Sequence, residues 1–152
     1  MDRKKNIFDK IGALVPGYKG YSEREGRRSS DKILRENICL KINIIEDNLS
    51  EEMLNISNDS KTIMKLEKAR KEINNLSSKI KFLEYGATSF FNDSQIDENE
   101  LSKIYQIDLE ISDFIDDFLK NKKKIWIKNS EILIKKCNEF LLKRKIFLSN
   151  FK

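Results

Sequence analysis

The sequence predicts an all-α protein, an antiparallel four-helix bundle of long helices with a short N-terminal helix, in one domain covering residues 1–152. Three observations predict this fold. Apolar side chains recur at alternating steps of three and four residues, as on the buried face of a helix. The chain contains one proline and five glycines, so few positions break a helix. No stretch alternates polar and apolar residues as a strand does.

The N-terminal segment, residues 3–14, is predicted to form a short amphipathic helix. Pro16 and Gly17 then suit the two central positions of a type II turn, because proline fixes one torsion and glycine accepts the positive φ that follows. Ser22 and Glu25 have the spacing of a capping box. We therefore expect the next helix to begin at Ser22.

The second and third predicted helices span residues 22–56 and 61–84. Residues 57–60, SNDS, offer capping side chains for a turn between them, and a continuous helix through this segment is the alternative. The spacing of the apolar residues in both helices is that of a coiled-coil seam. These residues are Leu34, Ile38, Ile42, Ile45, Leu49, Met53 and Ile56 in the first, and Leu66, Ala69, Ile73, Leu76, Ile80 and Leu83 in the second.

The fourth predicted helix, residues 97–119, has the clearest start signal in the chain. Asp97 suits the N-cap, and Glu100 stands where its side chain can complete a capping box. Before this helix, Phe90 and Phe91 are expected to close one end of the core.

The last predicted helix, residues 124–149, carries adjacent apolar pairs every seven residues. Such a wide stripe is typical of a helix embedded in a core, or of one that also serves a partner. The pairs are Trp126 and Ile127, Leu133 and Ile134, Phe140 and Leu141, and Phe147 and Leu148.

Charge is distributed unevenly along the chain, whose net charge is +5. Residues 92–118 hold nine acidic side chains and one basic one, whereas residues 119–152 hold eleven basic and two acidic side chains. If the last two helices lie side by side, they neutralise much of this excess. Basicity alone is therefore a weak argument for nucleic-acid binding.

The chain contains no histidine, which removes the most frequent general base and the commonest metal ligand. It also lacks a phosphate-binding loop, an H-E-x-x-H motif and a G-x-S-x-G motif. We therefore expect no enzyme, and no metal, cofactor or small-molecule substrate. No apolar run approaches the roughly 18 residues of a membrane span, so a cytoplasmic location is expected.

Two cysteines, Cys39 and Cys137, lie far apart in the sequence and outside any C-x-x-C spacing. We expect both to be small core residues in a reducing compartment. A disulfide or a reactive thiol is the alternative.

The least ordinary stretch is residues 15–36, VPGYKGYSEREGRRSSDKILRE. It places two tyrosines beside a basic helix, which makes a candidate binding surface. The alternatives are that the tyrosines pack on the end of the bundle, and that Asp31 pairs with Arg27 and Arg35, each four residues away. The candidate surface comprises Tyr18, Tyr21, Arg24, Arg27, Arg28, Lys32 and Arg35, with Trp126 from the last helix.

Asp108 falls inside the apolar stripe of the fourth helix. A carboxylate buried there needs a cation or a hydroxyl as partner. The candidates are Arg28 or Arg35 of the second helix, or a nearby tyrosine. Alternatively, the helix is rotated and Asp108 lies at the water's edge.

Two segments, PGYKGYSEREGRRSSDKILRE and YGATSFFNDSQIDENELSKIYQIDLEI, resemble a family of small, uncharacterised prokaryotic all-helical proteins. Members carry a P-G-Y-x-G-Y turn before an R-R-x-x-D-K helix and, later, a tyrosine and a D-L pair after an acidic helix start. The resemblance covers about residues 7–120 and implies the helical fold. It implies no activity, cofactor or catalytic residue.

These observations favour a non-enzymatic interaction or scaffold module that binds a protein partner or self-associates as a homo-oligomer. The wide stripe of the last helix and Trp126 present more apolar surface than packing at the edge of a bundle would bury. One alternative is nucleic-acid binding through the basic second and last helices. The other is attachment to a membrane surface through the apolar face of the N-terminal helix, formed by Ile7, Phe8, Ile11, Leu14 and Val15.

Overall fold

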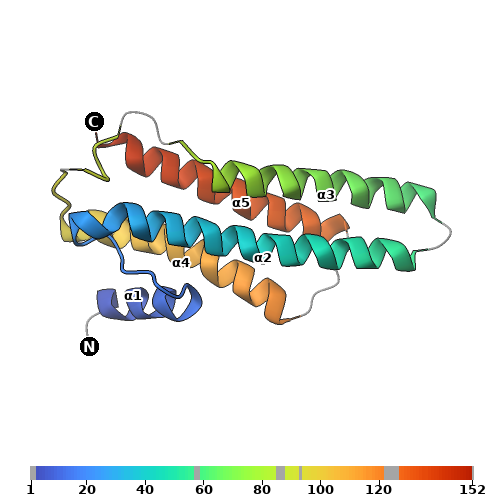
Figure 1. Ribbon diagram of the computed structural model, residues 1–152, viewed down its shortest axis with the longest axis horizontal. Helices are drawn as coiled ribbons and strands as arrows, with labels where there is room; N and C mark the ends of the chain where they lie inside the picture. The colour runs from blue at the N-terminus through green and yellow to red at the C-terminus, as the bar shows by residue number, and fades with distance from the viewer. Residues whose placement is uncertain (1–2, 57–58, 85–87, 93, 122–126, 152) are drawn as a thin grey trace.

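The computed structural model describes residues 3–56, 59–84, 88–92, 94–121 and 127–151. These residues form an all-α bundle without strands, in which four long helices lie lengthwise and a short one flanks them (Figure 1). The helices are α1 (Arg3–Leu14), α2 (Arg27–Asn55), α3 (Ser60–Lys81), α4 (Glu98–Lys120) and α5 (Ile127–Ser149).

Consecutive long helices run in opposite directions and form two hairpins, α2 with α3 and α4 with α5. The hairpins pack side by side, so that α3 contacts α5 and α2 contacts α4. Figure 1 shows that these two cross-hairpin pairs run parallel. The helix α1 packs on α4, at the end of the bundle where α2 and α4 begin.

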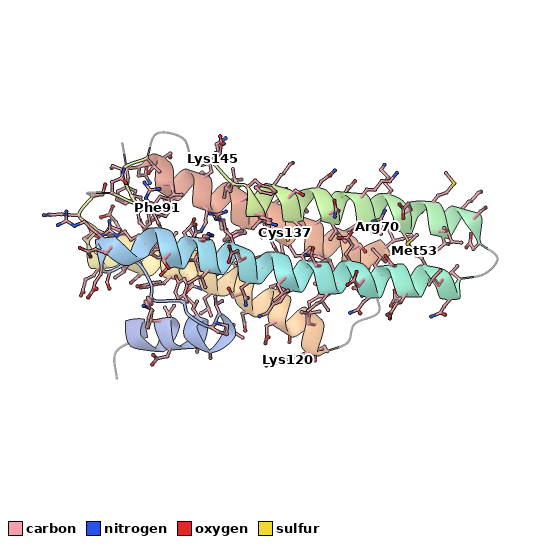
Figure 2. The ribbon with its side chains drawn as sticks, in the orientation of Figure 1. Met53, Arg70, Phe91, Lys120, Cys137 and Lys145 are labelled. Atoms are coloured by element: carbon pink, nitrogen blue, oxygen red, sulfur yellow. The ribbon has the colours of Figure 1, made fainter. Side chains whose placement is uncertain are left out.

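The core follows the predicted apolar spacing. The five positions from Leu34 to Leu49 on α2 and the five from Leu66 to Ile80 on α3 are buried. Phe90 is also buried, and its ring meets those of Phe147 and Phe151 edge-on, with 5.4 Å between centroids in each case. The predicted aromatic closure at this end is therefore confirmed. Figure 2 shows the long side chains, including those of Lys120 and Lys145, pointing away from the bundle.

Two of the predicted helix boundaries carry the expected caps. The side chain of Asp97 accepts a hydrogen bond from the Glu100 amide at 2.8 Å, and the Glu100 side chain accepts one from the Asp97 amide at 3.1 Å. At α3, Asp59 accepts from the Thr62 amide at 3.2 Å. Because α2 ends at Asn55 and α3 has its own N-cap, a continuous helix through this region is excluded.

The start of α2 differs from the prediction. The helix begins at Arg27 rather than Ser22, after a single 3-10 turn at Arg24–Gly26. The reason is that the main chain of Tyr21 is bonded elsewhere. Its amide donates to the Tyr105 hydroxyl at 3.0 Å, and its carbonyl accepts from the Arg27 guanidinium at 2.8 Å. These bonds hold the chain out of the helix, so Ser22 has no helical turn to cap.

The segment before α2 makes the predicted turn. The Tyr18 amide donates to the Val15 carbonyl at 3.2 Å, and Gly17 has a φ of 89°, as the third position of a type II turn requires. Gly20 bends the chain again with a φ of 79°. The two bends direct Tyr18 and Tyr21 into the bundle, where both are buried.

Gly20→Ala is expected to destabilise the protein by about 3 kcal/mol, because a side chain there meets both left-handed strain and overpacking. A Cβ at this position would press on the Tyr105 hydroxyl and lie 2.8 Å from the ring of Phe8. Urea unfolding followed by circular dichroism measures the loss. The control is Gly12→Ala, since a Cβ on Gly12 meets nothing within 4 Å and alanine favours the helix. Equal stability of the two variants would contradict the close approach at Gly20.

Candidate interaction surface

A buried polar cluster lies at the end of the bundle where α2 and α4 begin and α5 ends. Arg144 of α5 is fully buried there, and its guanidinium donates to both carboxylate oxygens of Asp108 on α4, at 3.0 Å each. The same guanidinium pairs with Asp31 of α2 and donates to the hydroxyl of Tyr21. One arginine thus connects three helices and the loop before α2.

The carboxylate of Asp108 is fully buried, which decides between the two alternatives for this residue. The hydroxyls of Tyr18 and Tyr21 donate to it at 2.9 and 2.5 Å, so the predicted tyrosine partners are present. The predicted arginine partners were wrong, because the cation is Arg144. Arg28 donates instead to the Asn92 side chain, and Arg35 to Asp31 and to two carbonyls at the end of α3.

Burial raises the pKa values of the tyrosines and of the aspartate in this cluster. It raises the pKa of Tyr18 and Tyr21 well above the ordinary value of a phenol, and the charge of Asp108 raises both further. Burial also raises the pKa of Asp108, against the opposing effects of Arg144 and the two hydroxyls. Because these groups are at most 5% exposed, no substrate reaches them, and the cluster is a structural one.

Arg27 is a second buried arginine, and its role is also structural. Its guanidinium donates to the carbonyls of Tyr21, Phe90 and Ser94 at 2.8, 2.9 and 2.7 Å. It therefore fastens the loop before α2 to the loop before α4. The predicted pairing of Asp31 with Arg35 is present at 3.0 Å, whereas the place of Arg27 in that triad is taken by Arg144.

The candidate surface predicted from the sequence therefore consists of some residues that are buried and some that are exposed. Tyr18, Tyr21 and Arg27 were wrongly placed on it, because all three are buried in making the contacts above. Arg24 is exposed in the 3-10 turn before α2, and Arg28 and Lys32 are exposed on its first turns, with Arg35 partly buried beside them. Arg24 and Arg28 border a hollow with Phe91 and Asn92. Trp126 lies outside the described residues.

The apolar face of α1 is turned toward the bundle. Ile11 and Val15 are fully buried, and Ile7, Phe8 and Leu14 pack against the same core. This is the face that attachment to a membrane surface would need. Within the described parts of the chain, no helix combines the length and the apolar composition of a membrane span.

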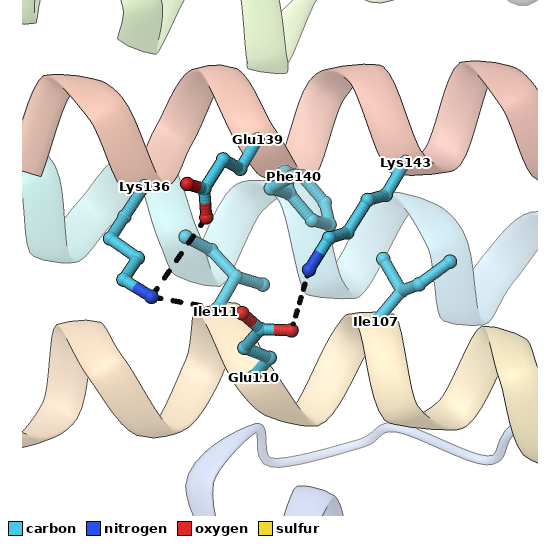
Figure 3. Close-up of a pocket in the computed structure, with 7 residues that line it drawn as sticks. All are labelled: Ile107, Glu110, Ile111, Lys136, Glu139, Phe140 and Lys143. Carbon is cyan, nitrogen blue, oxygen red and sulfur yellow. Dashed lines mark hydrogen bonds and ion pairs between the residues drawn. The ribbon is translucent and has the colours of Figure 1, made fainter.

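Opposite charges meet along the seam between α4 and α5, as the sequence indicated. Figure 3 shows Glu110 of α4 between Lys136 and Lys143 of α5, at 3.8 and 3.0 Å. These side chains lie over a small apolar hollow. Asp116 of α4 has partners outside this seam, Lys120 at 3.1 Å and Lys41 of α2 at 3.7 Å.

Both cysteines are free thiols in the core, as expected. The Cys39 thiol donates to the Ser77 carbonyl at 3.2 Å. Burial, and then the neighbouring Cys39, raises the pKa of Cys137 to about 12. Burial raises the pKa of Cys39 as well, so both thiols stay protonated at neutral pH, whereas the thiolate is the reactive form.

An apolar groove runs between the end of α3 and the second half of α5; we call it the α3–α5 groove. Phe82, just after α3, is 72% exposed on one side, and Leu142 of α5 is 58% exposed on the other. Lys79 and Lys145 also line it, and neither has an ion pair with any residue that the structure describes. The remaining lining residues are Leu83, Glu84, Asn138, Leu141 and Leu148. Leu141 and Leu148 belong to the wide stripe noted in the sequence, but Phe82 was not identified from it.

No protein-family model matches the chain, and comparison with curated proteins and with solved structures also finds no match. The resemblance of the two segments to a prokaryotic family therefore stays a prediction. Among the described residues, no three acidic or cysteine side chains are grouped as metal ligands.

Proposed function

We propose that the protein is a non-enzymatic interaction or scaffold module that docks a protein surface in the α3–α5 groove. The observation that carries this proposal is the exposure of Phe82 and Leu142 on either side of a leucine-lined floor. Removing apolar surface from water is favourable by roughly 25 cal/mol per Å², and a complex forms where this gain exceeds the cost of association. Contiguous apolar patches on a folded protein typically mark such contact sites.

The other exposed apolar side chains lack this arrangement. Met64 is as exposed as Phe82, at 72%, but lies near the opposite end of α3. Isolated apolar residues of this kind are ordinary on protein surfaces. The groove differs because several apolar side chains from two helices line one hollow.

The nucleic-acid alternative has less support. Tyr18 and Tyr21, the side chains that would stack on bases, are buried against Asp108. Part of the lysine charge on α5 is paired with Glu110. Leucines line the groove, and aliphatic side chains bind apolar protein groups better than they bind nucleobases.

Site-specific photo-crosslinking in cells that naturally produce the protein tests the proposal. A benzophenone amino acid replaces Phe82 in one variant and, in a control, Met64, which is equally exposed but lies near the start of α3. We expect a discrete protein adduct from position 82 and none from position 64. The same adducts from both positions, or no adduct at 82, would count against the groove as a docking site.

A further inference from the structure

The outward face of α2 is an acidic amphipathic surface. Leu40 and Ile44 are 62% and 45% exposed on it, although they lie in the middle of a long helix. Asp47 and Glu51 continue the same line at steps of three and four residues, and both are exposed. This line, Leu40–Glu51, lies opposite the buried stripe of α2; we call it the α2 outer face.

The carboxylates of this face, like the lysines of the groove, form no ion pair with a described residue. Neither Asp47 nor Glu51 has an ion pair within the described ranges, whereas the partly buried Lys41 and Glu46 of the same helix pair with Asp116 and Arg70. Lys79 and Lys145 in the groove also lack one. The molecule therefore presents two apolar surfaces. One carries the two negative charges of Asp47 and Glu51, and in the other two lysines outweigh the single carboxylate of Glu84.

We propose that the α3–α5 groove of one copy receives the α2 outer face of a second copy. This inference rests on the proposed function and names the occupant of the groove. Docking covers Leu40 and Ile44 against Phe82 and Leu142. It also brings the carboxylates near the lysines, which favours this pairing over others.

The two surfaces match in length as well as charge. The α2 outer face covers eleven residue steps, about 16 Å at the rise of an α-helix. The part of the groove formed by α5, from Asn138 to Leu148, covers ten steps, about 15 Å. Since the described residues offer no strand edge for main-chain pairing, a helix in a groove is the docking mode left to these surfaces.

Other ways of using a second copy fit less well. A symmetric contact of groove against groove would bring together two surfaces that each carry two lysines and one glutamate, and this net like charge costs free energy. In the bundle, α2 contacts α3 and α4 and lies diagonal to α5. Because the outer face of α2 points away from the core, it lies on a different side of the molecule from the groove. One copy therefore cannot fill its own groove, and each copy can join two others head to tail.

Analytical ultracentrifugation of the full chain tests this arrangement. The wild type is expected to show a mass that rises steadily with concentration and passes beyond a dimer. A groove variant, Lys79→Glu with Lys145→Glu, and a face variant, Asp47→Lys with Glu51→Lys, are each expected to weaken association about tenfold or more. Ile132→Ser, near the start of α5 and on the helix diagonal to α2, serves as control and keeps wild-type behaviour.

Mixing the two variants is the decisive step. The acidic face of the groove variant fits the intact groove of the face variant, so association returns in the mixture. A single chain carrying all four reversals restores it as well, because both surfaces have exchanged sign. Circular dichroism shows that each variant keeps the helical content of the wild type.

Three results would overturn the inference: a wild type that is monomeric at every concentration, a face variant that associates normally, and a mixture that stays monomeric. If the wild type is monomeric while position 82 still captures a protein in cells, the proposed function stands and only the named occupant fails. If neither occurs, both proposals fail together.

Discussion

Replacing Arg144 with methionine is expected to lower the free energy of unfolding by about 3–5 kcal/mol, the cost of breaking a buried ion pair from one side. The guanidinium is fully buried and neutralises Asp108 and Asp31. Methionine adapts to irregular core space, so the loss comes mainly from the unpaired carboxylates rather than from a cavity. Urea unfolding at pH 7 measures it.

Two further variants separate charge from packing. Adding Asp108→Asn to Arg144→Met removes one uncompensated charge while Tyr18 and Tyr21 keep an acceptor, so part of the stability returns. Arg70→Met is the surface control. Arg70 pairs with Glu67 and Glu46 at 2.6 and 3.1 Å, but exposed pairs of this kind contribute little. Equal losses for Arg144→Met and Arg70→Met would contradict the role of the buried cluster.

Raising the pH above 10 is expected to unfold the protein in one cooperative step. Burial raises the pKa of Tyr18 and Tyr21 well above the ordinary value, and that of Cys137 to about 12. The folded chain therefore keeps protons that the unfolded chain releases near its ordinary pKa values, about 8.5 for cysteine and 10 for tyrosine. This stability is fully present below those values and is lost as the pH rises past them.

The size of this effect follows from proton linkage. Each of the three groups lowers the free energy of unfolding by about 1.4 kcal/mol for every pH unit above its unfolded pKa. At pH 11 the three losses sum to about 6 kcal/mol. That is comparable to the whole stability of a typical domain. We expect the ultraviolet absorbance of phenolate and the loss of helical circular dichroism to change together. Phenolate from Tyr18 or Tyr21 in a protein that is still helical would contradict their burial against Asp108.

The helices could be predicted because their signal is local. Apolar residues recur at the period of a helix from Leu34 to Leu49 and from Leu66 to Ile80. Only a helix places residues with this spacing on one buried face. The capping box at Asp97 and Glu100 is local too, and it is present. Ser22 and Glu25 have an equally good local pattern. There the bonds of Tyr21 to Tyr105 and Arg27 override it, and the sequence does not reveal them.

The buried cluster could be predicted only in part. Asp108 was identified because it interrupts an apolar stripe. Arg144 interrupts one as well, between Phe140 and Phe147, but it lies in the run KRK and was counted only as part of the basic charge of residues 119–152. Asking of every charged residue whether it falls inside an apolar stripe would have identified Arg144 as well. The partners of both residues come from distant segments, so no spacing rule could join them.

The α3–α5 groove could not be predicted from the chain alone. Phe82 and Leu142 stand beside Leu83 and Leu141 of the predicted stripes, and only the packing of the two hairpins determines that they line one uncovered groove. Leu40 and Ile44 differ from them, because both lie off the predicted buried stripe of α2, and both are exposed.

The most direct test of the account is a concentration series of methyl nuclear magnetic resonance spectra. We expect the methyl signals of Leu40, Ile44 and Leu142 to shift together with one dissociation constant, while the buried methyl groups of Ile73 stay in place. Shifts confined to one surface, or no shift at any concentration, would contradict the docking of the α2 outer face in the α3–α5 groove.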